Sequence, residues 1–489
     1  MDVRITKLNE VFVKLRCEHS IGQEISDYFT FLVPGAQFTK EFKNKLWDGK
    51  IRLFDRRSNT LYHGLVSYVE KFCKDRDYSF EISKEVNLTE EFSVVEAERF
   101  VAALKLPAHI DKRAYQVDAF VRGVRNKRML LVSPTASGKS LFLYMNLRYL
   151  QYKKFKKGLL VVPTTALVEQ MYKDFETYGY NSEKHCHRVY EGREKNTDKF
   201  LTITTWHSIY KNPPEWFEQF DFVFGDEAHE FKATSLKTIM TSLVNAKFRI
   251  GCTGTLDGTK THKLVLEGLF GPHYQNITTS QLIKAGYASE LNIKCLILKH
   301  SDDACRLVKQ MDYAAEIDYI VSSKARNRFL KNLSLSLKGN TLVLFNLVEK
   351  HGKDLYRIIK EEAGNRKVFF VYGKTEVAVR EEVRSIVENE IDAIIIASYG
   401  TFARGINIRN LHNIIFASPS KSRIRNLQSI GRSLRIGNNK SMAILYDVSD
   451  DFRIDKFVNF TLKHFVERVK IYDESKFPYK FYNIELKDE

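Results

Sequence analysis

From residue 129 onward the chain repeats one pattern, in which a short apolar run is followed by a polar turn and then by a helical stretch. Runs of this kind, rich in Val, Ile and Leu, are typical of strands in a parallel sheet that is buried on both faces. The first series of runs lies at 129–132, 159–162, 201–203, 222–224 and 248–252. The second series lies at 293–298, 342–345, 368–371, 393–397, 414–417 and 442–446. Two such series predict two α/β domains in tandem.

Residues 1–105 follow a different pattern, with alternating apolar and polar positions at 11–15 (VFVKL) and 51–54 (IRLF). A period of two is typical of strands that bury one face only. We therefore expect a small α+β domain at 1–105, a first α/β domain at 106–285 and a second at 286–489. The break between the two α/β domains falls near Gly286.

Length and composition agree with three domains. The chain has 489 residues, about three times the roughly 150 residues of a typical domain. A hydrophobic content of 44% excludes wholesale disorder. No window approaches the roughly 18 apolar residues of a membrane helix, and the first residues, with Asp2 among bases, do not resemble a secretory signal. We therefore expect a soluble protein of the cytoplasm.

The six cysteines do not suggest a disulfide framework or a zinc site. No two of them have the spacing C-x-x-C. His185, Cys186 and His187 are adjacent, but a structural zinc ion needs four converging ligands and no second Cys/His pair lies nearby in the sequence. We interpret these three residues as part of a polar loop.

The formal net charge of +17 predicts a polyanionic partner, but the charge is unevenly distributed. Residues 1–105 have no net charge, whereas 106–280 carry +8 and 281–489 carry +9. Within the neutral part, seven bases and three acids lie between Lys40 and Arg57, around Phe42, Trp47 and Phe54. Cations interleaved with rings suit nucleic acid. An amphipathic hairpin that packs its own rings explains the same pattern equally well.

The apolar run at 129–132 is followed by the sequence SPTASGKS at 133–140 and then by an apolar helix. This sequence departs from the phosphate-binding pattern G-x-x-x-x-G-K-[ST] only at Ser133, which replaces the first glycine. Gly138 lets the backbone approach a phosphate, Lys139 can reach the β- and γ-phosphates, and the hydroxyl of Ser140 can ligate Mg²⁺. The pattern predicts a nucleoside triphosphate site.

A second motif supports this prediction. The apolar run at 222–225 ends at Asp226 and Glu227. Asp226 at the end of a buried strand can hold Mg²⁺, and Glu227 can polarise the attacking water as a general base. Together with the upstream loop, the two carboxylates predict a nucleotide hydrolase.

The sequence DEAH at 226–229 after Gly-Lys-Ser resembles the superfamily 2 helicases of the DEAH type, whose motor consists of two RecA-like domains. Residues 253–255 (TGT) resemble the family motif that couples hydrolysis to strand movement. The resemblance implies that ATP and Mg²⁺ bind at Gln116, Ser137, Gly138, Lys139, Ser140, Asp226, Gly405 and Asn407. It also implies nucleic-acid contacts from Pro163, Thr164, Thr205, Phe345 and Thr401.

Gln428, Gly431, Arg432 and Arg435 match the family pattern Q-x-x-G-R-x-x-R. Their spacing of i, i+3, i+4 and i+7 places them on one face of a helix. If that face points at the γ-phosphate, Arg432 and Arg435 act as arginine fingers, which are worth roughly 10³–10⁵ in rate. The resemblance therefore adds Gln428, Arg432 and Arg435 to Lys139 and the two carboxylates as catalytic residues.

The stretch NKLWDGKIRL at 44–53 is not a general feature of superfamily 2. Together with the PTASGKS loop, the sequence TGTLDG at 253–258 and the basic, aromatic tail, it resembles the UvsW-type helicases of T-even-type phages over essentially the whole chain. Departures are modest, with Ser133 and Ala136 in the phosphate loop and DEAH where DECH is expected. The resemblance implies an N-terminal accessory domain that binds DNA through Lys43, Lys45, Trp47, Lys50 and Arg52.

The same resemblance implies an ATP-dependent DNA motor that acts on branched DNA. Such enzymes migrate Holliday junctions, reverse stalled forks and unwind the RNA–DNA hybrid of R-loops, in recombination, replication and repair. It further implies a monomer in the host cytoplasm that works with a small phage partner protein. Two alternatives stay open on the sequence: an RNA helicase, because DEAH boxes are common there, and a binding platform that uses nucleotide only as a switch.

Overall fold

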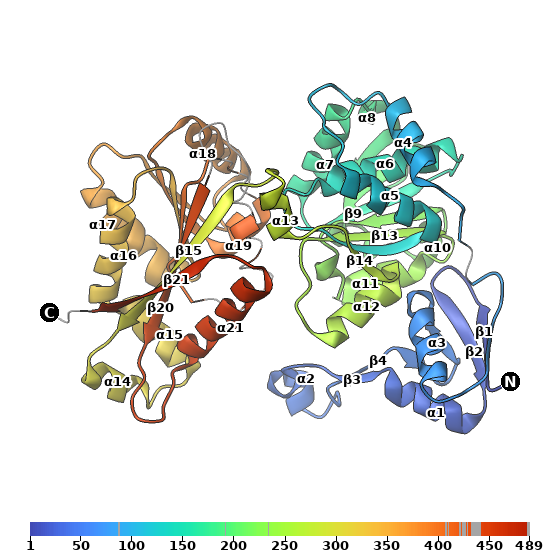
Figure 1. Ribbon diagram of the computed structural model, residues 1–489, viewed down its shortest axis with the longest axis horizontal. Helices are drawn as coiled ribbons and strands as arrows, with labels where there is room; N and C mark the ends of the chain where they lie inside the picture. The colour runs from blue at the N-terminus through green and yellow to red at the C-terminus, as the bar shows by residue number, and fades with distance from the viewer. Residues whose placement is uncertain are drawn as a thin grey trace. The chain divides into compact units, whose positions relative to one another are not determined.

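The computed structural model describes residues 1–489 except 87–88, 191, 233, 406–407, 409, 420–421, 423–426, 428, 432–441 and 487–489. At 232, 377 and 403–405 the description is limited to the backbone. The described residues form two compact units (Figure 1). The first contains residues 1–133 and 138–276, and the second contains residues 134–137 and 277–489.

The N-terminal residues form a small α+β domain, as the alternating pattern predicts. Among the described residues its five strands have the order β5-β6-β2-β1-β7, with β1 antiparallel to β2 and parallel to β7. In β1, Val3 and Ile5 are buried and Arg4 between them is exposed. The elements are β1 (Val3–Lys7), β2 (Phe12–Cys17), α1 (His19–Tyr28), β5 (Phe54–Asp55), β6 (Thr60–Tyr62), η2 (His63–Leu65), α3 (Val66–Lys74) and β7 (Phe80–Ile82).

A two-stranded arm, residues 30–52, interrupts this domain between α1 and β5. It consists of β3 (Thr30–Leu32), η1 (Ala36–Phe38), α2 (Lys40–Lys43) and β4 (Lys50–Arg52), with β3 antiparallel to β4. Figure 1 shows the arm extending away from the five-stranded sheet, with α2 at its far end. Gly49 has a φ of +75°, and a Cβ there would lie 3.0 Å from both the Phe42 ring and Ala36. Glycine thus lets the ring pack against the backbone of the arm.

The first motor sheet is parallel throughout, and its described strands have the order β10-β11-β9-β12-β13-β8-β14. Consecutive residues of β8, Leu130 and Leu131, pack in separate apolar clusters on the two faces of the sheet. The strand is therefore apolar along its length. The strands are β8 (Arg128–Val132), β9 (Gly158–Val162), β10 (Cys186–Val189), β11 (Leu201–Thr205), β12 (Phe222–Gly225), β13 (Phe248–Thr253) and β14 (His273–Gln275). The helices are α4 (Val94–Ala103), α5 (Ala114–Asn126), α6 (Lys139–Tyr152), α7 (Thr165–Thr177), α8 (Ser182–His185), α9 (Trp206–Ile209), α10 (Pro214–Phe217), η3 (Ala228–Lys232), α11 (Thr234–Ser242) and α12 (Lys260–Phe270).

The polar loop expected at residues 185–187 is wrong. His185 ends α8, and Cys186 begins β10 at the edge of the sheet, where its side chain is buried. The strand pairs with β11 on one side only, and its buried positions are separated by two half-buried ones, so its apolar signal is weak. Within the described residues no group of three or more His, Cys, Asp or Glu side chains is arranged to hold a metal ion.

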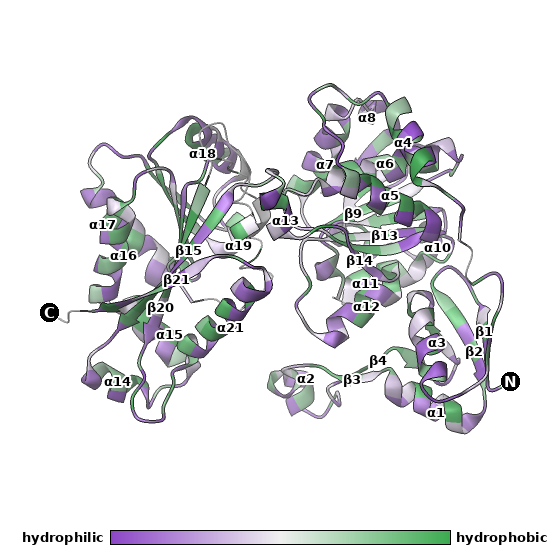
Figure 2. Cartoon of the chain, viewed as in Figure 1, coloured by the Kyte–Doolittle hydropathy of each residue, from purple (hydrophilic) through white to green (hydrophobic). Residues whose placement is uncertain are grey.

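The second motor sheet is also parallel, and its described strands have the order β17-β18-β16-β19-β20-β15-β21. In Figure 2, green and purple alternate along helices such as α16 and α21, as expected for helices with one buried face. The strands are β15 (Glu290–Lys299), β16 (Thr341–Phe345), β17 (Val368–Val371), β18 (Ile394–Ser398), β19 (Asn413–Phe416), β20 (Met442–Asp451) and β21 (Tyr479–Glu485). The helices are α13 (Thr279–Lys284), α14 (Asp302–Val308), α15 (Tyr313–Ser322), α16 (Lys324–Ser336), η4 (Val348–Gly352), α17 (Lys353–Glu362), α18 (Val377–Asn389), α19 (Tyr399–Gly405) and α21 (Phe460–Glu474).

These two parallel sheets and the small mixed sheet confirm the predicted fold class. Each apolar run of the two series lies in a strand of a motor sheet to within one residue, whereas the run at 51–54 is divided between β4 and β5. Buried ion pairs join α16 and α21 to β20: Arg326 donates to Asp450, and Arg468 donates to Asp447. In the part of the chain that is described, no helix is long and apolar enough to cross a bilayer.

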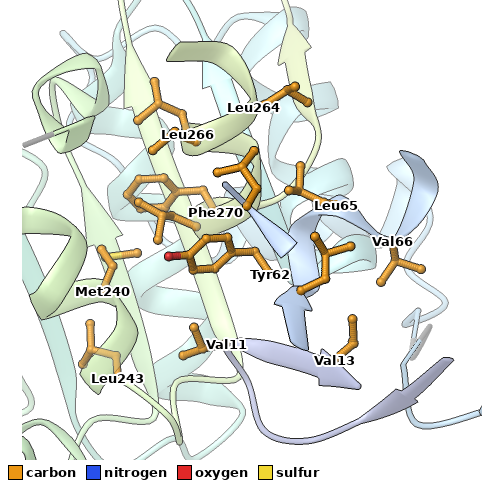
Figure 3. Packing of buried hydrophobic residues seen from close by; sticks show 14 of the residues in the cluster. Val11, Val13, Tyr62, Leu65, Val66, Met240, Leu243, Leu264, Leu266 and Phe270 are labelled. Carbon is orange, nitrogen blue, oxygen red and sulfur yellow. The ribbon is translucent and has the colours of Figure 1, made fainter. Parts of the chain in front are cut away.

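The N-terminal domain and the first motor sheet share one apolar core (Figure 3). Val11 and Tyr62 from the N-terminal sheet belong to the same buried cluster as Leu243 and Phe270 from the motor domain. The contact is close: a Cβ on Gly64 would lie 1.9 Å from the carbonyl oxygen of Glu267 in α12. The backbones of η2 and α12 therefore touch, and only a glycine fits between them.

Polar bonds reinforce this shared core. The Arg128 guanidinium, at the start of β8, donates to the carbonyl oxygen of Glu10 at 2.6 Å and to its carboxylate at 2.8 Å. The backbone N–H of Glu10 donates to the carbonyl oxygen of Val244. Tyr68 of α3 donates to the carboxylate of Glu267 at 2.6 Å. The N-terminal domain is therefore fixed to the motor sheet by packing and by directional bonds.

We expect Gly64→Ala to lower the free energy of unfolding by about 1–3 kcal/mol, the usual cost of overpacking. The added methyl meets a backbone atom, so a side-chain rotation cannot relieve the clash. Chemical denaturation of the full-length protein measures this cost. Gly373→Ala is the control, because a Cβ at Gly373 has no heavy atom within 4 Å. Equal stability of the two variants would contradict the close backbone contact.

Candidate active site

The phosphate loop connects β8 to α6. Gly138 precedes the helix with a φ of +81°, a left-handed conformation that glycine adopts without strain. Lys139 is the first residue of α6, and its ammonium group donates to the carbonyl oxygen of Ser133 at 3.2 Å. The first backbone N–H groups of α6 lack partners within the helix and attract an anion. This end of the sheet can therefore bind a phosphate chain, as the sequence predicts.

Gln116 lies beside this loop. It is buried in the first turn of α5, where its side-chain oxygen Oε1 accepts a hydrogen bond from the backbone N–H of Arg113 at 2.9 Å. A Cβ on Gly138 would lie 2.2 Å from the Gln116 amide nitrogen. The structure thus brings Gln116, one of the residues expected to bind ATP, next to the phosphate loop, in an orientation set by capping its own helix.

The two carboxylates follow β12. Asp226 is buried, and its backbone N–H donates to the carbonyl oxygen of Val161 in the neighbouring strand. Burial, and next the charge of Glu227, raise the pKa of Asp226 to about 6. One oxygen of Asp226, Oδ1, is buried and has no hydrogen-bond partner among the described residues. A buried carboxylate oxygen of this kind suits a hard cation such as Mg²⁺.

Glu227 adopts a φ of +48°, which is uncommon for a residue with a side chain. Its carboxylate lies 3.3 Å from His229 Nδ1. Burial disfavours the charged form of His229, but hydrogen bonds with Glu227 and Glu230 outweigh burial and raise its pKa to about 9. His229 is therefore protonated at neutral pH and places a positive charge beside Glu227, the general-base candidate.

His229 also joins this loop to the TGT motif. Its Nδ1 lies 3.1 Å from the hydroxyl of Thr253 at the end of β13. The Thr253 hydroxyl donates to the carbonyl oxygen of Thr255 and so accepts from His229. One histidine thus connects the general-base candidate to the motif that resembles the coupling element of the family.

Tyr178 is a site residue that the sequence analysis missed. Its hydroxyl lies 2.7 Å from the hydroxyl of Ser140, directly after the phosphate-loop lysine. Burial raises the pKa of Tyr178 to about 12, so the phenol stays neutral and can accept the Ser140 proton. Both lone pairs of Ser140 are then free to face a cation. No motif signals this contact, because Tyr178 follows α7 and reaches Ser140 only through the fold.

Residues expected to contact nucleic acid from the first motor domain lie where strands meet helices. Thr164 follows β9 and caps α7 by accepting from the backbone N–H of Leu167. Thr205 ends β11, and its hydroxyl lies 2.9 Å from that of Ser208. Pro163 precedes Thr164 in the same turn. Both threonine hydroxyls already have partners within the protein.

In the second motor domain the structure places two expected contacts inside the protein. Phe345 is fully buried and stacks on Phe370 with ring centroids 5.6 Å apart. Its side chain is therefore unavailable to nucleic acid, because it fills the core where β16 ends. Thr401 is buried in α19, with its hydroxyl 2.8 Å from that of Ser398. Gly405 is the last residue of α19.

Four residues expected at the nucleotide lie outside the described residues. These are Asn407, Gln428, Arg432 and Arg435.

The five residues expected to contact DNA from the N-terminal domain all lie in the arm. Lys43, Lys45 and Lys50 are exposed. Arg52 forms an exposed ion pair with Asp48, and that hydrogen bond is the main reason why the pKa of Asp48 falls to about 2. Trp47 is half-buried and donates from its ring nitrogen to the carbonyl oxygen of Lys50 at 2.9 Å.

The arm also exposes apolar side chains. Leu32 is 62% exposed, Phe38 75% and Leu46 79%. The arm therefore packs one ring, that of Phe42, on its own backbone while leaving lysines and apolar side chains at its surface. The packed Phe42 ring agrees with the interpretation as a hairpin, and the nucleic-acid contact stays a prediction.

The sheets and motifs define a superfamily 2 helicase. Three family models match successive parts of the chain: DNA helicase UvsW, N-terminal, at residues 2–83; type III restriction enzyme, res subunit, at 97–258; and helicase conserved C-terminal domain at 324–437. The chain is 33% identical to the ATP-dependent DNA helicase uvsW of Enterobacteria phage T4, over 99% of this chain and 100% of the relative. The chain therefore belongs to the UvsW family of ATP-dependent DNA helicases.

Solved structures agree. The crystal structure of T4 UvsW matches the whole of both chains with a TM-score of 0.53 and 32% identity. A DNA-bound type ISP restriction-modification enzyme, LlaBIII, matches 78% of this chain and 32% of its own length with a TM-score of 0.57 and 16% identity. The second likeness shows the fold alone.

Tyr178→Phe removes the partner of the Ser140 hydroxyl. A hydrogen bond of this kind is worth about 1 kcal/mol, so we expect the KM for ATP in the presence of Mg²⁺ to rise about fivefold. Steady-state ATPase assays at varied ATP measure the change. Tyr180→Phe is the matched control, because the Tyr180 hydroxyl donates to Gln151 and not to the phosphate loop. An unchanged KM in the Tyr178 variant would show that the contact is incidental.

Proposed function

We propose that the protein uses the energy of ATP hydrolysis, with Mg²⁺, to move along and remodel branched DNA. The substrates are Holliday junctions, stalled forks and R-loops, and the process belongs to phage recombination, replication and repair. The observation that supports this proposal is that the basic arm extends from a domain whose apolar core is shared with the sheet that carries Asp226 and Glu227. A motor that engages duplex or junction through a part fixed to its ATPase domain can apply force at the branch.

At the nucleotide, Lys139 would bind the β- and γ-phosphates, and Gln116 would recognise the adenine. Ser140 and the unpaired oxygen of Asp226 would hold Mg²⁺, which neutralises charge on the phosphates when bound. Glu227, beside the protonated His229, would accept the proton of the attacking water. Ser137 and Gly138 would position the phosphate chain through the backbone of the loop.

From the second motor domain, the motif resemblance assigns nucleotide contacts to Gly405 and Asn407. It also assigns Gln428, Arg432 and Arg435 to the γ-phosphate, where the arginines would stabilise charge in the transition state.

On the nucleic acid, the arm would supply the first contacts. Lys43, Lys45, Lys50 and Arg52 are cations for phosphates, and Trp47 offers one ring face. Pro163, Thr164 and Thr205 would contact a strand through backbone N–H groups at helix starts, because the threonine hydroxyls are bonded internally. Phe345 and Thr401 are buried, so they would act by shaping the strand ends of the second sheet.

Lys139→Ala and Glu227→Gln test the motor. We expect each to lower DNA-stimulated ATP hydrolysis at least about a hundredfold, because each removes charge stabilisation or the general base. Strand separation on a forked DNA should disappear with hydrolysis. Lys173→Ala, an exposed change on α7, is the control. Full strand separation by both catalytic variants would instead favour a nucleotide-switched binding platform.

The substrate class is tested by ATPase and unwinding assays on forks, four-way junctions, R-loops and RNA duplexes of equal length. Branched DNA should stimulate hydrolysis more than RNA does. Stimulation by single-stranded RNA alone would point to an RNA helicase.

The arm is tested by the triple variant Lys43→Ala, Lys45→Ala and Lys50→Ala. If all three contact duplex phosphates, the slope of log affinity against log salt should fall in magnitude by about 2.7, or about 0.9 per contact. Junction binding at several salt concentrations measures the slope. The control triple variant changes Lys71, Lys74 and Lys84, which are exposed on the N-terminal domain outside the arm. Identical slopes for the two triple variants would remove the arm from the DNA interface.

A further inference from the structure

The first turn of α12 contacts the loop at residues 226–229, which carries Asp226 and Glu227. His262 is buried there, and its Nε2 donates to the backbone carbonyl oxygen of His229 at 3.0 Å. The other ring nitrogen lies 2.9 Å from the carboxylate of Asp257. That carboxylate also accepts from the backbone N–H and the hydroxyl of Thr259, the residue that caps α12.

These bonds fix the position of His262. Burial alone would raise the pKa of Asp257, but the His262 ring at 2.9 Å and hydrogen bonds from Thr259 outweigh it and lower the pKa to about 2. Asp257 is therefore a permanent anion that orients the imidazole. From His262, one hydrogen bond leads to His229, and His229 in turn holds Glu227. The start of α12 is thus two side chains away from the general-base candidate.

The same turn of α12 touches the root of the arm. The exposed ammonium group of Lys260 lies 5.1 Å from the centre of the Phe31 ring in β3. It lies 5.8 Å from the Tyr28 ring at the end of α1. Cation–ring contacts of this length are attractive. Lys260 therefore joins α12 to β3, the first strand of the arm.

The C-terminal half of α12 packs against the N-terminal domain. The backbone of Glu267 abuts Gly64, and a Cβ on Gly268 would lie 3.1 Å from the Tyr62 side chain. Because helix and domain meet backbone to backbone, a shift of one is transmitted to the other rather than absorbed by side chains. Few alternative packings are open to such a contact.

We propose that α12 couples DNA engagement at the arm to the placement of Glu227, with Lys260 and His262 as positioning residues. The inference rests on the proposed function, since it assumes that the arm binds DNA. A strand held by the arm shifts β3 and α1, Lys260 and the packed face carry the shift to α12, and His262 moves the backbone of His229. DNA thereby raises the rate of hydrolysis without touching the nucleotide.

The test measures ATP hydrolysis with and without saturating four-way junction DNA, together with the KM for ATP, the Kd for the junction and the melting temperature. His262→Leu should lose most of the stimulation by DNA, about tenfold, within the 5–150-fold range of typical coupling between sites. Its KM for ATP and its Kd for the junction should match the wild type, and its basal rate should fall far less than its stimulated rate. His262→Gln should restore much of the stimulation, because its amide nitrogen can still donate to His229.

Lys260→Met should reduce stimulation about threefold. Lys263→Met is its matched control, because Lys263 lies on the same helix and, among the described residues, contacts no ring or carboxylate. If the two positioning residues act along one route, the double variant Lys260→Met, His262→Leu should be no worse than His262→Leu alone.

The outcomes separate the two proposals. A wild-type protein whose hydrolysis does not respond to any DNA would overturn the proposed function. A wild type that responds, with His262→Leu responding equally, would overturn the coupling role of α12. In a third outcome, the basal and stimulated rates of His262→Leu fall by the same factor, its melting temperature falls, and His262→Gln does not recover. That result would show that His262 serves only in packing, and it would overturn the inference as well.

Discussion

The packing of the N-terminal sheet on α11 and α12 is the contact on which the arrangement of the first unit depends. Its core is continuous with that of the motor sheet, and Gly64 brings two backbones into direct contact. A domain connected only by a linker would reorient freely. Here the buried Arg128–Glu10 pair and the Tyr68–Glu267 bond add directional constraints. The domain from which the arm extends is consequently held in one orientation relative to the first motor sheet.

The parallel sheets explain why the chemistry gathers where it does. Burial on both faces favours apolar strands, so the polar side chains of the site lie where strands end. In the first motor sheet Ser133, Asp226 and Thr253 all directly follow or end neighbouring strands, at the same edge. This edge is also where ligands bind in open parallel sheets. The catalytic loop, the phosphate loop and the TGT motif are neighbours because of strand order and not because of their spacing in the sequence.

Most of the fold could be predicted from the sequence, since long apolar runs separated by helical stretches leave few alternatives. The strand β10 could not, because an edge strand needs little apolar character and Cys186 lies between two histidines. The phosphate loop and the carboxylates were predictable as well, because their chemistry demands particular residues at fixed spacing. Phe345 shows the limit of transferring a motif by resemblance: the residue is at the expected strand end, but its ring is part of the core.

Tyr178, His262 and Lys260 were not predictable, for a common physical reason. Each acts through a partner that is distant in sequence, and each is of a type that occurs widely as ordinary packing or surface residues. Only the fold brings Tyr178 to Ser140, or Lys260 to Phe31. The position of the arm is a further case, since its lysines were visible in the sequence but its attachment to the ATPase core was not.

The shared core also sets an order of events during synthesis. Val11 and Tyr62 leave the ribosome well before their apolar partners, which include Leu243 and Phe270. At roughly 5–20 residues per second, the interval between them is about 10–40 seconds. During that time the face of β2 and β6 is exposed and prone to association with other chains. The nascent N-terminal sheet thus lacks part of its apolar cover until α12 has been synthesised.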